Sequence, residues 1–548
     1  MPDVLRETAS RHLTGQEAIA VARTELRGLT ALAIMVMLGA MPTICHGGEE
    51  LMKCTVAVEL GQDKGQSLGS LFEARTEDGS FVLGAGFCDV YNTRNRTDRM
   101  VVQFFVRPTD GIREFSLEPL PRPWSATGTY MFNVADQLVA MTPSDDTAAR
   151  VWDATTASWL SQEGTAPARV RVDGGTLAFG DGRFWHDGRA VLDAPAQGSY
   201  QCFYYADGHL LFYHVFRGQG NGYRAWESDE DGFSKLYACP WRPSDGTPVD
   251  LSLAVVETLP IVGETTFSWG QLDGAPLTCS NIGGVYVFDG TGWRTIRQPT
   301  LGESFQVYTM VRYYDRLLLG QYPTGEFFEF DGDDLRLLED WPPRIEGVSG
   351  SSRECQTATI WGGELIAGVW PWAELWRHNA DTDSWQTMGR LFSHPEAHAD
   401  PGHPYQTQCD ELGLVSNQWG QRVTSMVPLG DSLMISTSAK WPFEPSPAPD
   451  FMTEEQLAEY GTVWRMRLPG CLSAPIHWAP EQTEFEFIVT ADAMQIRQNG
   501  LLLAETSISP DLAVRIAAAG RVVSPEWGTG AYGPFGGASV AGVAEMPE

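Results

Sequence analysis

The chain has 548 residues, and its 70 acidic residues outnumber its 38 basic residues to give a net charge of −32. A surface this negative repels nucleic acid and anionic lipid, and no cluster of Lys or Arg stands out, so the composition argues against nucleic-acid binding. Only 20% of residues are charged, while Gly 57, Pro 34 and Trp 19 suit many short strands joined by tight turns, so we expect an all-β fold with little helix.

An apolar run, Leu29–Met41, follows Arg23 and Arg27 and precedes the small residues Gly47 and Gly48. This order is typical of a secretory signal peptide, and the run is short for a membrane span. We interpret residues 1–47 as a signal peptide, with a signal anchor as the alternative. We therefore expect a monomer that is secreted, periplasmic or held at the cell surface.

Nine cysteines are present, and eight remain if the segment that carries Cys45 is removed. An even number in an exported chain permits disulfide bonds, and we expect two or three of them. Buried free thiols are the alternative. The eight are Cys54, Cys88, Cys202, Cys239, Cys279, Cys355, Cys409 and Cys471.

Eight places combine a turn dipeptide with the start of an apolar strand, which is the signal of a β-hairpin. The repetition predicts a β-propeller over residues 48–477 with seven blades, six or eight being the alternatives. The eight turns are Asp78-Gly79, Asp136-Gln137, Asp173-Gly174, Asp207-Gly208, Asp273-Gly274, Asp315-Arg316, Gly362-Gly363 and Gly430-Asp431.

Residues 478–548 differ in character from the rest of the chain. The runs Phe485–Val489 and Met494–Ile496, followed by Asn499-Gly500 before another apolar run, predict a hairpin that closes or flanks the propeller. The Gly- and Ala-rich stretch 528–548 is expected to be mobile.

The segment Ile360–Gly368, with Trp376 and Trp385 after it, resembles a kelch repeat through its glycine doublet and its Trp after a turn. Asp153 to Trp159 is similar to the second half of another such repeat. This resemblance implies a propeller that serves as a noncatalytic scaffold for a glycan or a protein.

A second resemblance lies in the middle of the chain. Ser199–Phe203, Asp207–His214 and Gly218–Gly222 are similar to a repeat of sialidase-type (BNR-like) propellers, a group that includes ulvan-lyase-like polysaccharide-degrading enzymes. The following Ser228–Ser234 is similar to an Asp-box, but Glu230 replaces the Asp. This resemblance implies a carbohydrate ligand.

A lyase that acts on a uronic acid needs a cation for the carboxylate, a base for the C5 proton and an acid for the leaving oxygen. His, Tyr and Arg residues in the first half of the chain supply these groups, with packing between blades as the alternative role. Alternation along the strand places His209 and Tyr213 on one face and Phe212 on the other. The candidate catalytic residues are His186, His209, Tyr213, His214, Arg217 and Arg224.

Three histidines, His394, His398 and His403, lie within ten residues of a Pro- and Gly-rich stretch. Imidazoles beside carboxylates suit a divalent metal such as zinc or calcium, and loops on a rigid scaffold are where function is often placed. Solvated surface histidines are the alternative.

Five tryptophans near the blade ends could stack on sugar rings, although propellers also use Trp to fill the space between blades. They are Trp370, Trp372, Trp376, Trp441 and Trp464. The sequence as a whole predicts an exported propeller that engages a polysaccharide or glycan in a central pocket or on its loops. It leaves open whether the chain is a polysaccharide lyase or related enzyme, or a noncatalytic scaffold that binds a glycan or a protein.

Overall fold

The computed structural model describes residues 49–545 apart from short internal gaps, and the first compact unit, Met1–Gly47, lies outside the described residues together with the predicted signal segment. Within the described part no helix is long and apolar enough to cross a membrane. The internal gaps are residues 61–67, 93–99, 112, 135–136, 143–144, 163–167, 173–174, 181, 218–230, 401, 445–447 and 480.

Seven antiparallel sheets, each with four strands in blade order, succeed one another in the described residues, and one of them has a fifth strand added at its inner edge. We number them as blades 1 to 7. Blade 1 holds β7 (Tyr130–Val134), β8 (Gln137–Thr142), β9 (Asp145–Asp153) and β10 (Ser158–Gln162); blade 2 holds β11 (Ala168–Val172), β12 (Gly175–Gly180), β13 (Arg183–His186) and β14 (Arg189–Leu192); blade 3 holds β15 (Ser199–Ala206), β16 (His209–Phe216), β17 (Phe233–Pro240) and β18 (Val255–Thr258).

The remaining blades follow the same order, except that the last one takes its outer strand from the N-terminal side of the chain. Blade 4 holds β19 (Thr266–Leu272), β20 (Ala275–Ser280), β21 (Val285–Phe288) and β22 (Trp293–Arg297); blade 5 holds β23 (Gln306–Tyr313), β24 (Arg316–Tyr322), β25 (Phe327–Phe330) and β26 (Leu335–Leu338); blade 6 holds β27 (Glu354–Trp361), β28 (Glu364–Trp370), β29 (Glu374–Asn379) and β30 (Ser384–Arg390); blade 7 holds β31 (Gln421–Leu429), β32 (Ser432–Ala439), β33 (Val463–Arg467) and β6 (Ser116–Leu120).

Hydroxyl groups on the inner strands connect neighbouring blades and close the ring. The Oγ of Ser268 donates to the carbonyl of Val307 in the next blade at 2.8 Å. The N–H of Met131 in blade 1 donates to the Oγ of Ser425 in blade 7, also at 2.8 Å. The last blade therefore contacts the first, and the β-propeller predicted from the repeats is confirmed.

The predicted turn signals fall where each inner strand of a blade turns into the second strand. Seven of the eight lie between these strand pairs in blades 1 to 7, although Asp136 and Asp173-Gly174 themselves fall outside the described residues, and the eighth, Asp78-Gly79, joins β2 to β3 outside the propeller. Five inner strands, β15, β19, β23, β27 and β31, also carry one extra residue near their start, a β-bulge that no turn signal marks.

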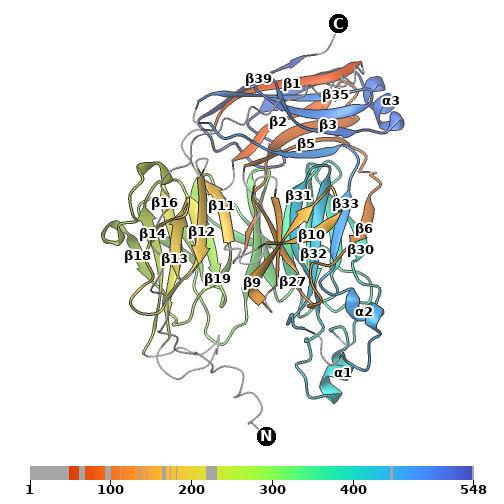
Figure 1. The fold of residues 1–548 in the computed structure, drawn as a ribbon. Coiled ribbons are helices and arrows are strands. Elements are labelled where there is room, and N and C mark those ends of the chain that lie inside the picture. Colours follow the sequence, from red (N-terminus) through yellow and green to blue (C-terminus); the bar gives the residue numbers. More distant parts are fainter. Residues whose placement is uncertain are drawn as a thin grey trace, which may run out of the picture. The chain divides into compact units, whose positions relative to one another are not determined.

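The two ends of the described chain pair in a β-sandwich, which Figure 1 shows as orange strands beside blue strands. One sheet has the order β37 (Leu501–Ser507), β36 (Ala493–Gln498), β35 (Thr483–Thr490), β1 (Glu50–Glu59), β39 (Ser539–Glu545). The other has the order β34 (Cys471–Pro475), β5 (Val101–Pro108), β3 (Phe81–Phe87), β2 (Gly69–Thr76), β38 (Val522–Trp527).

The sandwich differs from the expected domain boundaries. Strands β1, β2, β3 and β5 were assigned to the propeller, but they form two sheets with strands from residues 471–545. The Asn499-Gly500 hairpin is present between β36 and β37, yet the sheet that it enters is not a blade. The tail predicted to be mobile contributes β39, which pairs with β1 from Lys53–Glu545 to Glu59–Ser539 because the edge of that sheet is available to it.

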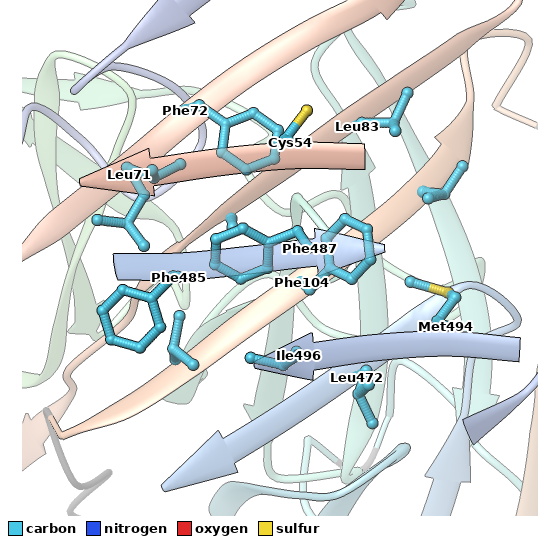
Figure 2. Close-up of a cluster of buried hydrophobic side chains, with 14 of the residues drawn as sticks. Cys54, Leu71, Phe72, Leu83, Phe104, Leu472, Phe485, Phe487, Met494 and Ile496 are labelled. Carbon is cyan, nitrogen blue, oxygen red and sulfur yellow. The ribbon is translucent and has the colours of Figure 1, made fainter. Parts of the chain in front are cut away.

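Aromatic and aliphatic side chains from both sheets fill the sandwich, and Figure 2 shows Phe487 between Phe72 and Phe104. The ring centroids lie 5.5 Å apart for Phe72 and Phe487 and 5.3 Å apart for Phe104 and Phe487. The short helix α3 (Pro510–Ala518) adds Ile516 to this core, and the side chain of Ser509 caps its first turn.

The connection that leaves the sandwich after β3 lies against the inner strands of the propeller. β4 (Tyr91–Asn92) pairs with Ser268 and Trp269 of β19, and the Cys88 thiol lies 3.7 Å from the Thr359 hydroxyl of β27. Inner strands present their free edges to the axis of a propeller, so this segment occupies part of the space where the sequence interpretation placed a central pocket.

Two insertions at blade 7, residues 391–420 and 440–462, share one small core that we call the insertion platform. α1 (Gln406–Glu411) lies in the first insertion and α2 (Glu454–Ala458) in the second. Trp419 packs on Phe443 with ring centroids 5.2 Å apart, and Tyr405 packs on Phe451 at the same distance. Thr453 and Gln456 form a capping box that starts α2.

The expected disulfide bonds are absent among the described cysteines, so that prediction is wrong. All eight described cysteines are free thiols, and seven of them are buried. They are distributed over six hydrophobic clusters, where a thiol acts as a small apolar side chain. Burial raises the pKa of Cys54 to about 12, which keeps that thiol protonated.

Candidate functional site

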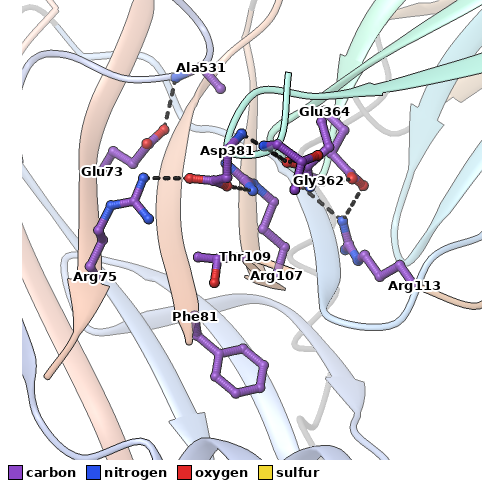
Figure 3. A network of polar contacts seen from close by, with 12 residues as sticks. Glu73, Arg75, Phe81, Arg107, Thr109, Arg113, Gly362, Glu364, Asp381 and Ala531 are labelled. Carbon is purple, nitrogen blue, oxygen red and sulfur yellow. Dashed lines mark hydrogen bonds and ion pairs between the residues drawn. The ribbon is translucent and has the colours of Figure 1, made fainter. Parts of the chain in front are cut away.

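The turn between β29 and β30 is built by an asparagine. The Oδ1 of Asn379 accepts hydrogen bonds from the backbone N–H groups of Asp381, at 2.8 Å, and Thr382, at 3.1 Å. An Asn side chain that bonds the backbone two residues on fixes a tight turn. The turn thereby holds the Asp381 carboxylate toward two arginines of the sandwich (Figure 3).

Asp381 joins blade 6 to the sandwich. Its carboxylate pairs with Arg75 of β2 at 2.5 Å and with Arg107 of β5, whose side chain is fully buried. Burial alone would raise the pKa of the Asp381 carboxyl, but Arg107 and Arg75 outweigh it, so that pKa lies below its ordinary value. The pair is therefore ionised at neutral pH.

Glu73 is a partly buried acid beside the same arginines. It accepts the backbone N–H of Ala531 at 3.1 Å, as Figure 3 shows. Burial raises the pKa of Glu73, and Arg107 only partly opposes this effect. Two carboxylates of one network thus have pKa values shifted in opposite directions. Asp381 forms ion pairs with both arginines, whereas burial outweighs the attraction of the arginines at Glu73.

Arg113 lies on the segment that leads from the sandwich into β6. It donates to Glu364 at 2.8 Å and to the carbonyl of Gly362 at 3.2 Å, and it lies 2.8 Å from the Cys471 sulfur. Gly362 and Gly363 both have positive φ, and a Cβ on either would lie within 2.5 Å of Cys471 or Phe105. The glycine doublet of the kelch-like segment is thus a place where the sandwich packs directly against blade 6 and leaves no room for a side chain.

An open hollow of about 620 Å³ borders this junction. Residues 110–111 and 113–115 form one wall, and β30 with its preceding turn forms the other, because Ser384 and Gln386 project from the same face of the strand. Phe115 is half-buried, while Asp110, Glu114 and the polar residues of blade 6 are exposed. We call it the junction hollow; its lining residues are Asp110, Gly111, Arg113, Glu114, Phe115, Thr382, Ser384 and Gln386.

A second hollow of about 370 Å³ shares Glu114 and Phe115 with the first. Arg467 and Asp431 of blade 7 line it, and their side chains pair at 3.2 Å. Ser507 and Ser509 of the sandwich also line it. A polar surface therefore continues across Phe115 from blade 6 to blade 7.

The structure separates the predicted catalytic residues. Tyr213 is fully buried between blades 3 and 4, where its hydroxyl lies 3.1 Å from that of Thr278. His209 lies on the same face of β16 and packs on Phe288 of blade 4, with Phe212 on the opposite face as alternation predicts. Both side chains therefore point between blades.

The other members of that set have different neighbours. His186 packs on Trp241, with ring centroids 5.9 Å apart. The Nε2 of His214 lies 2.8 Å from the carbonyl of Gln197, and burial lowers the pKa of this imidazole. Arg217 donates to the carbonyl of Gly263 at 3.2 Å, and Arg224 lies outside the described residues. The placed members do not meet at a common point.

The three histidines of the predicted metal site have separate environments. His394 is buried, with Nδ1 2.7 Å from the Tyr405 hydroxyl and Nε2 2.8 Å from the Gln456 carbonyl. His403 packs on Trp370, and His398 is exposed near Trp372. In the part of the chain that the structure describes, no three His, Cys, Asp or Glu residues are grouped to hold a metal ion.

The tryptophans proposed for sugar stacking divide into two kinds. Trp370, Trp372 and Trp376 are buried, and Trp464 is half-buried. Trp441 is 54% exposed and lies at the start of the second insertion of the platform.

Sequence reasoning missed the junction hollow because its walls come from segments about 270 residues apart. A signal was present in the run Val101–Pro108, where apolar residues continue without alternation and end at Arg107. Such a run indicates a strand buried on both faces, and a buried Arg requires an acidic partner.

The sheets and their closure place the chain in the class of β-propeller proteins. No protein-family model matches it, and no curated protein does either. Among solved structures, BamB from Moraxella catarrhalis aligns over 75% of this chain and 96% of the BamB chain, with 11% sequence identity and a TM-score of 0.30. YCF48 bound to D1 peptide aligns over 65% of this chain and 97% of the YCF48 chain, with 12% sequence identity and a TM-score of 0.33. Similarity of this size bears on nothing beyond the fold.

Proposed function

We propose that this chain is an exported, noncatalytic β-propeller scaffold that binds a glycan in the junction hollow. The observation that carries the proposal is an open hollow of about 620 Å³ in which an aromatic ring lies among exposed polar side chains. Small-molecule sites measure about 300–1,000 Å³. Export is inferred from the order of charged, apolar and small residues at the N-terminus.

The lining suits a sugar because hydroxyl groups both donate and accept hydrogen bonds. Asp110 and Glu114 carry acceptors, and the hydroxyls of Thr382 and Ser384, which bond each other, keep acceptor lone pairs. The Oε1 of Gln386 accepts from Arg377, so its amide N–H groups are the donors that Gln386 supplies. Phe115 offers an apolar face on which a pyranose ring can stack. Because the second hollow shares Phe115, an extended chain of several sugars could continue from blade 6 to blade 7.

The positions of Tyr213 and His209 favour a scaffold over a polysaccharide lyase. A base or acid must reach the proton that it transfers, directly or through one water. Tyr213 is fully buried between two blades, and His209 packs against Phe288. Both side chains thus pack between blades, which is the alternative role that the sequence analysis gave for the His, Tyr and Arg residues.

Incubating the purified protein with a panel of neutral and acidic polysaccharides tests the proposal, with binding and the absorbance of unsaturated uronate products as the two measurements. We expect binding to at least one glycan and no rise in absorbance. A rise in absorbance would establish the lyase instead. The absence of binding across the panel would reject the glycan proposal.

A further inference from the structure

The insertion platform exposes a group of large apolar side chains. Leu412, Leu414 and Val415 are 61%, 42% and 58% exposed, and Trp441 is 54% exposed. Three of these four lie within four residues of one turn, directly after α1. Single exposed apolar residues are normal on a protein surface, but a group of them indicates an interaction surface.

The platform is packed well enough to present these side chains in a fixed place. Trp419, four residues after Val415, is buried against Phe443 and Tyr460. His394 connects the insertions through its contacts with Tyr405 and the Gln456 carbonyl. The apolar side chains are therefore exposed although a core is available beside them.

The charged side chains of the two insertions are nearly all acidic. The two insertions contain one basic residue, Lys440, which pairs with the buried Glu354 of β27. Asp410 and Glu411 directly precede Leu412 and are exposed. The acidic residues of the insertions are Glu396, Asp400, Asp410, Glu411, Glu444, Asp450, Glu454, Glu455 and Glu459.

We propose that the insertion platform docks a segment of a partner protein that carries basic and apolar side chains together. A second copy of this chain would bring the same acidic insertions against themselves in a two-fold pair, which like charges oppose. An anionic membrane is repelled for the same reason. A basic segment gains from the acidic residues while its apolar side chains cover Leu412, Leu414 and Val415.

The test uses the whole purified chain and two synthetic peptides of equal positive charge, one with Lys and Leu on opposite helix faces and one with Lys and Ser. At about 0.15 M salt we expect only the Lys/Leu peptide to bind with measurable affinity. Replacing Leu412→Ser, Leu414→Ser and Val415→Ser together should weaken that binding about tenfold or more.

The control variant carries Leu501→Ser and Leu502→Ser on β37, where both leucines are also exposed, at 57% and 46%, and it should bind the peptide as the wild type does. Equal binding of both peptides, or an unchanged affinity of the triple variant, would overturn the proposal. A dimer in sedimentation that the triple variant abolishes would show that a second copy is the occupant. Glycan binding should survive the triple variant, so this proposal and the junction hollow fail independently.

Discussion

The propeller and the sandwich differ in how far apart along the chain their paired strands lie. In blades 1 to 6 each strand pairs with the next one, as β27 does with β28. In the sandwich, Lys53 pairs with Ile488 on one side and with Glu545 on the other. Local pairing leaves a turn signal between the partners, whereas distant pairing leaves none. The blades can therefore be predicted from the sequence. The sandwich shows turn signals only at local hairpins such as β2–β3 and β36–β37, and its other pairings depend on contacts between distant segments.

Removing the central ring of the sandwich should have the largest effect. Phe487→Ala leaves a cavity among Phe72, Phe104 and their neighbours, and we expect it to lower the free energy of unfolding by about 3–5 kcal/mol. Urea unfolding followed by tryptophan fluorescence measures this. Leu502→Ala in the exposed edge strand is the control, with an effect within about 0.5 kcal/mol. If both variants unfold alike, Phe487 does not support the core.

The ion pairs between the two regions should come next. Asp381→Ala leaves the fully buried Arg107 without its carboxylate, and we expect a loss of about 3 kcal/mol in urea unfolding. Asp333→Ala is the matched control because Asp333 pairs with Arg294 on the surface, where such pairs contribute about 0–1 kcal/mol. A loss at Asp381 no greater than at Asp333 would mean that the network does not hold the sandwich to blade 6.

Glu73 offers a smaller effect with the opposite sign. Burial raises the pKa of Glu73 in the folded state above the ordinary value of 4.5. The folded protein therefore loses stability as the pH rises from 4.5 through the folded-state pKa, because Glu73 ionises more readily in the unfolded chain. Glu73→Gln should therefore be more stable than the wild type at neutral pH, and the two should converge as the pH falls below 4.5. Denaturation midpoints across pH measure this.

Glu118→Gln is the control for the pH series, because Arg465 and Arg467 lower the pKa of Glu118. Its stabilising contribution is present above the unfolded-state pKa and is lost as the pH falls through the folded one, so this variant should not gain stability at neutral pH. A Glu73→Gln variant that is less stable than the wild type at neutral pH would show that Arg107 outweighs burial at this site.

The smallest effect is expected from reduction. Because all eight described cysteines are free thiols, neither region is cross-linked there, and adding dithiothreitol should leave the melting temperature unchanged. A native disulfide contributes about 2–4 kcal/mol, which would appear as a fall of several degrees. Such a fall in melting temperature would show that disulfide bonds are present, as the sequence analysis expected.

The sequence predicted those features that depend on neighbouring residues. The turns at Asp207-Gly208 and Gly362-Gly363 lie where their dipeptides indicated, because positive φ and the next apolar strand are both local properties. The sequence could not pair Asp381 with Arg107 or bring Phe115 beside Gln386, since those contacts join segments about 270 residues apart. The three histidines of the predicted metal site are close in sequence, but His394 contacts Tyr405 and the Gln456 carbonyl while His403 packs on Trp370, and spacing alone does not show such partners.

The most direct test of the account compares Phe115→Ala with Trp441→Ala in binding to the glycan that the panel identifies, measured by calorimetry. Phe115 lies in both hollows of the junction, and Trp441 is the most exposed of the candidate tryptophans but lies on the insertion platform. We expect Phe115→Ala to weaken glycan binding about tenfold or more and Trp441→Ala to leave it unchanged. Loss of glycan binding on Trp441→Ala with none on Phe115→Ala would contradict the account.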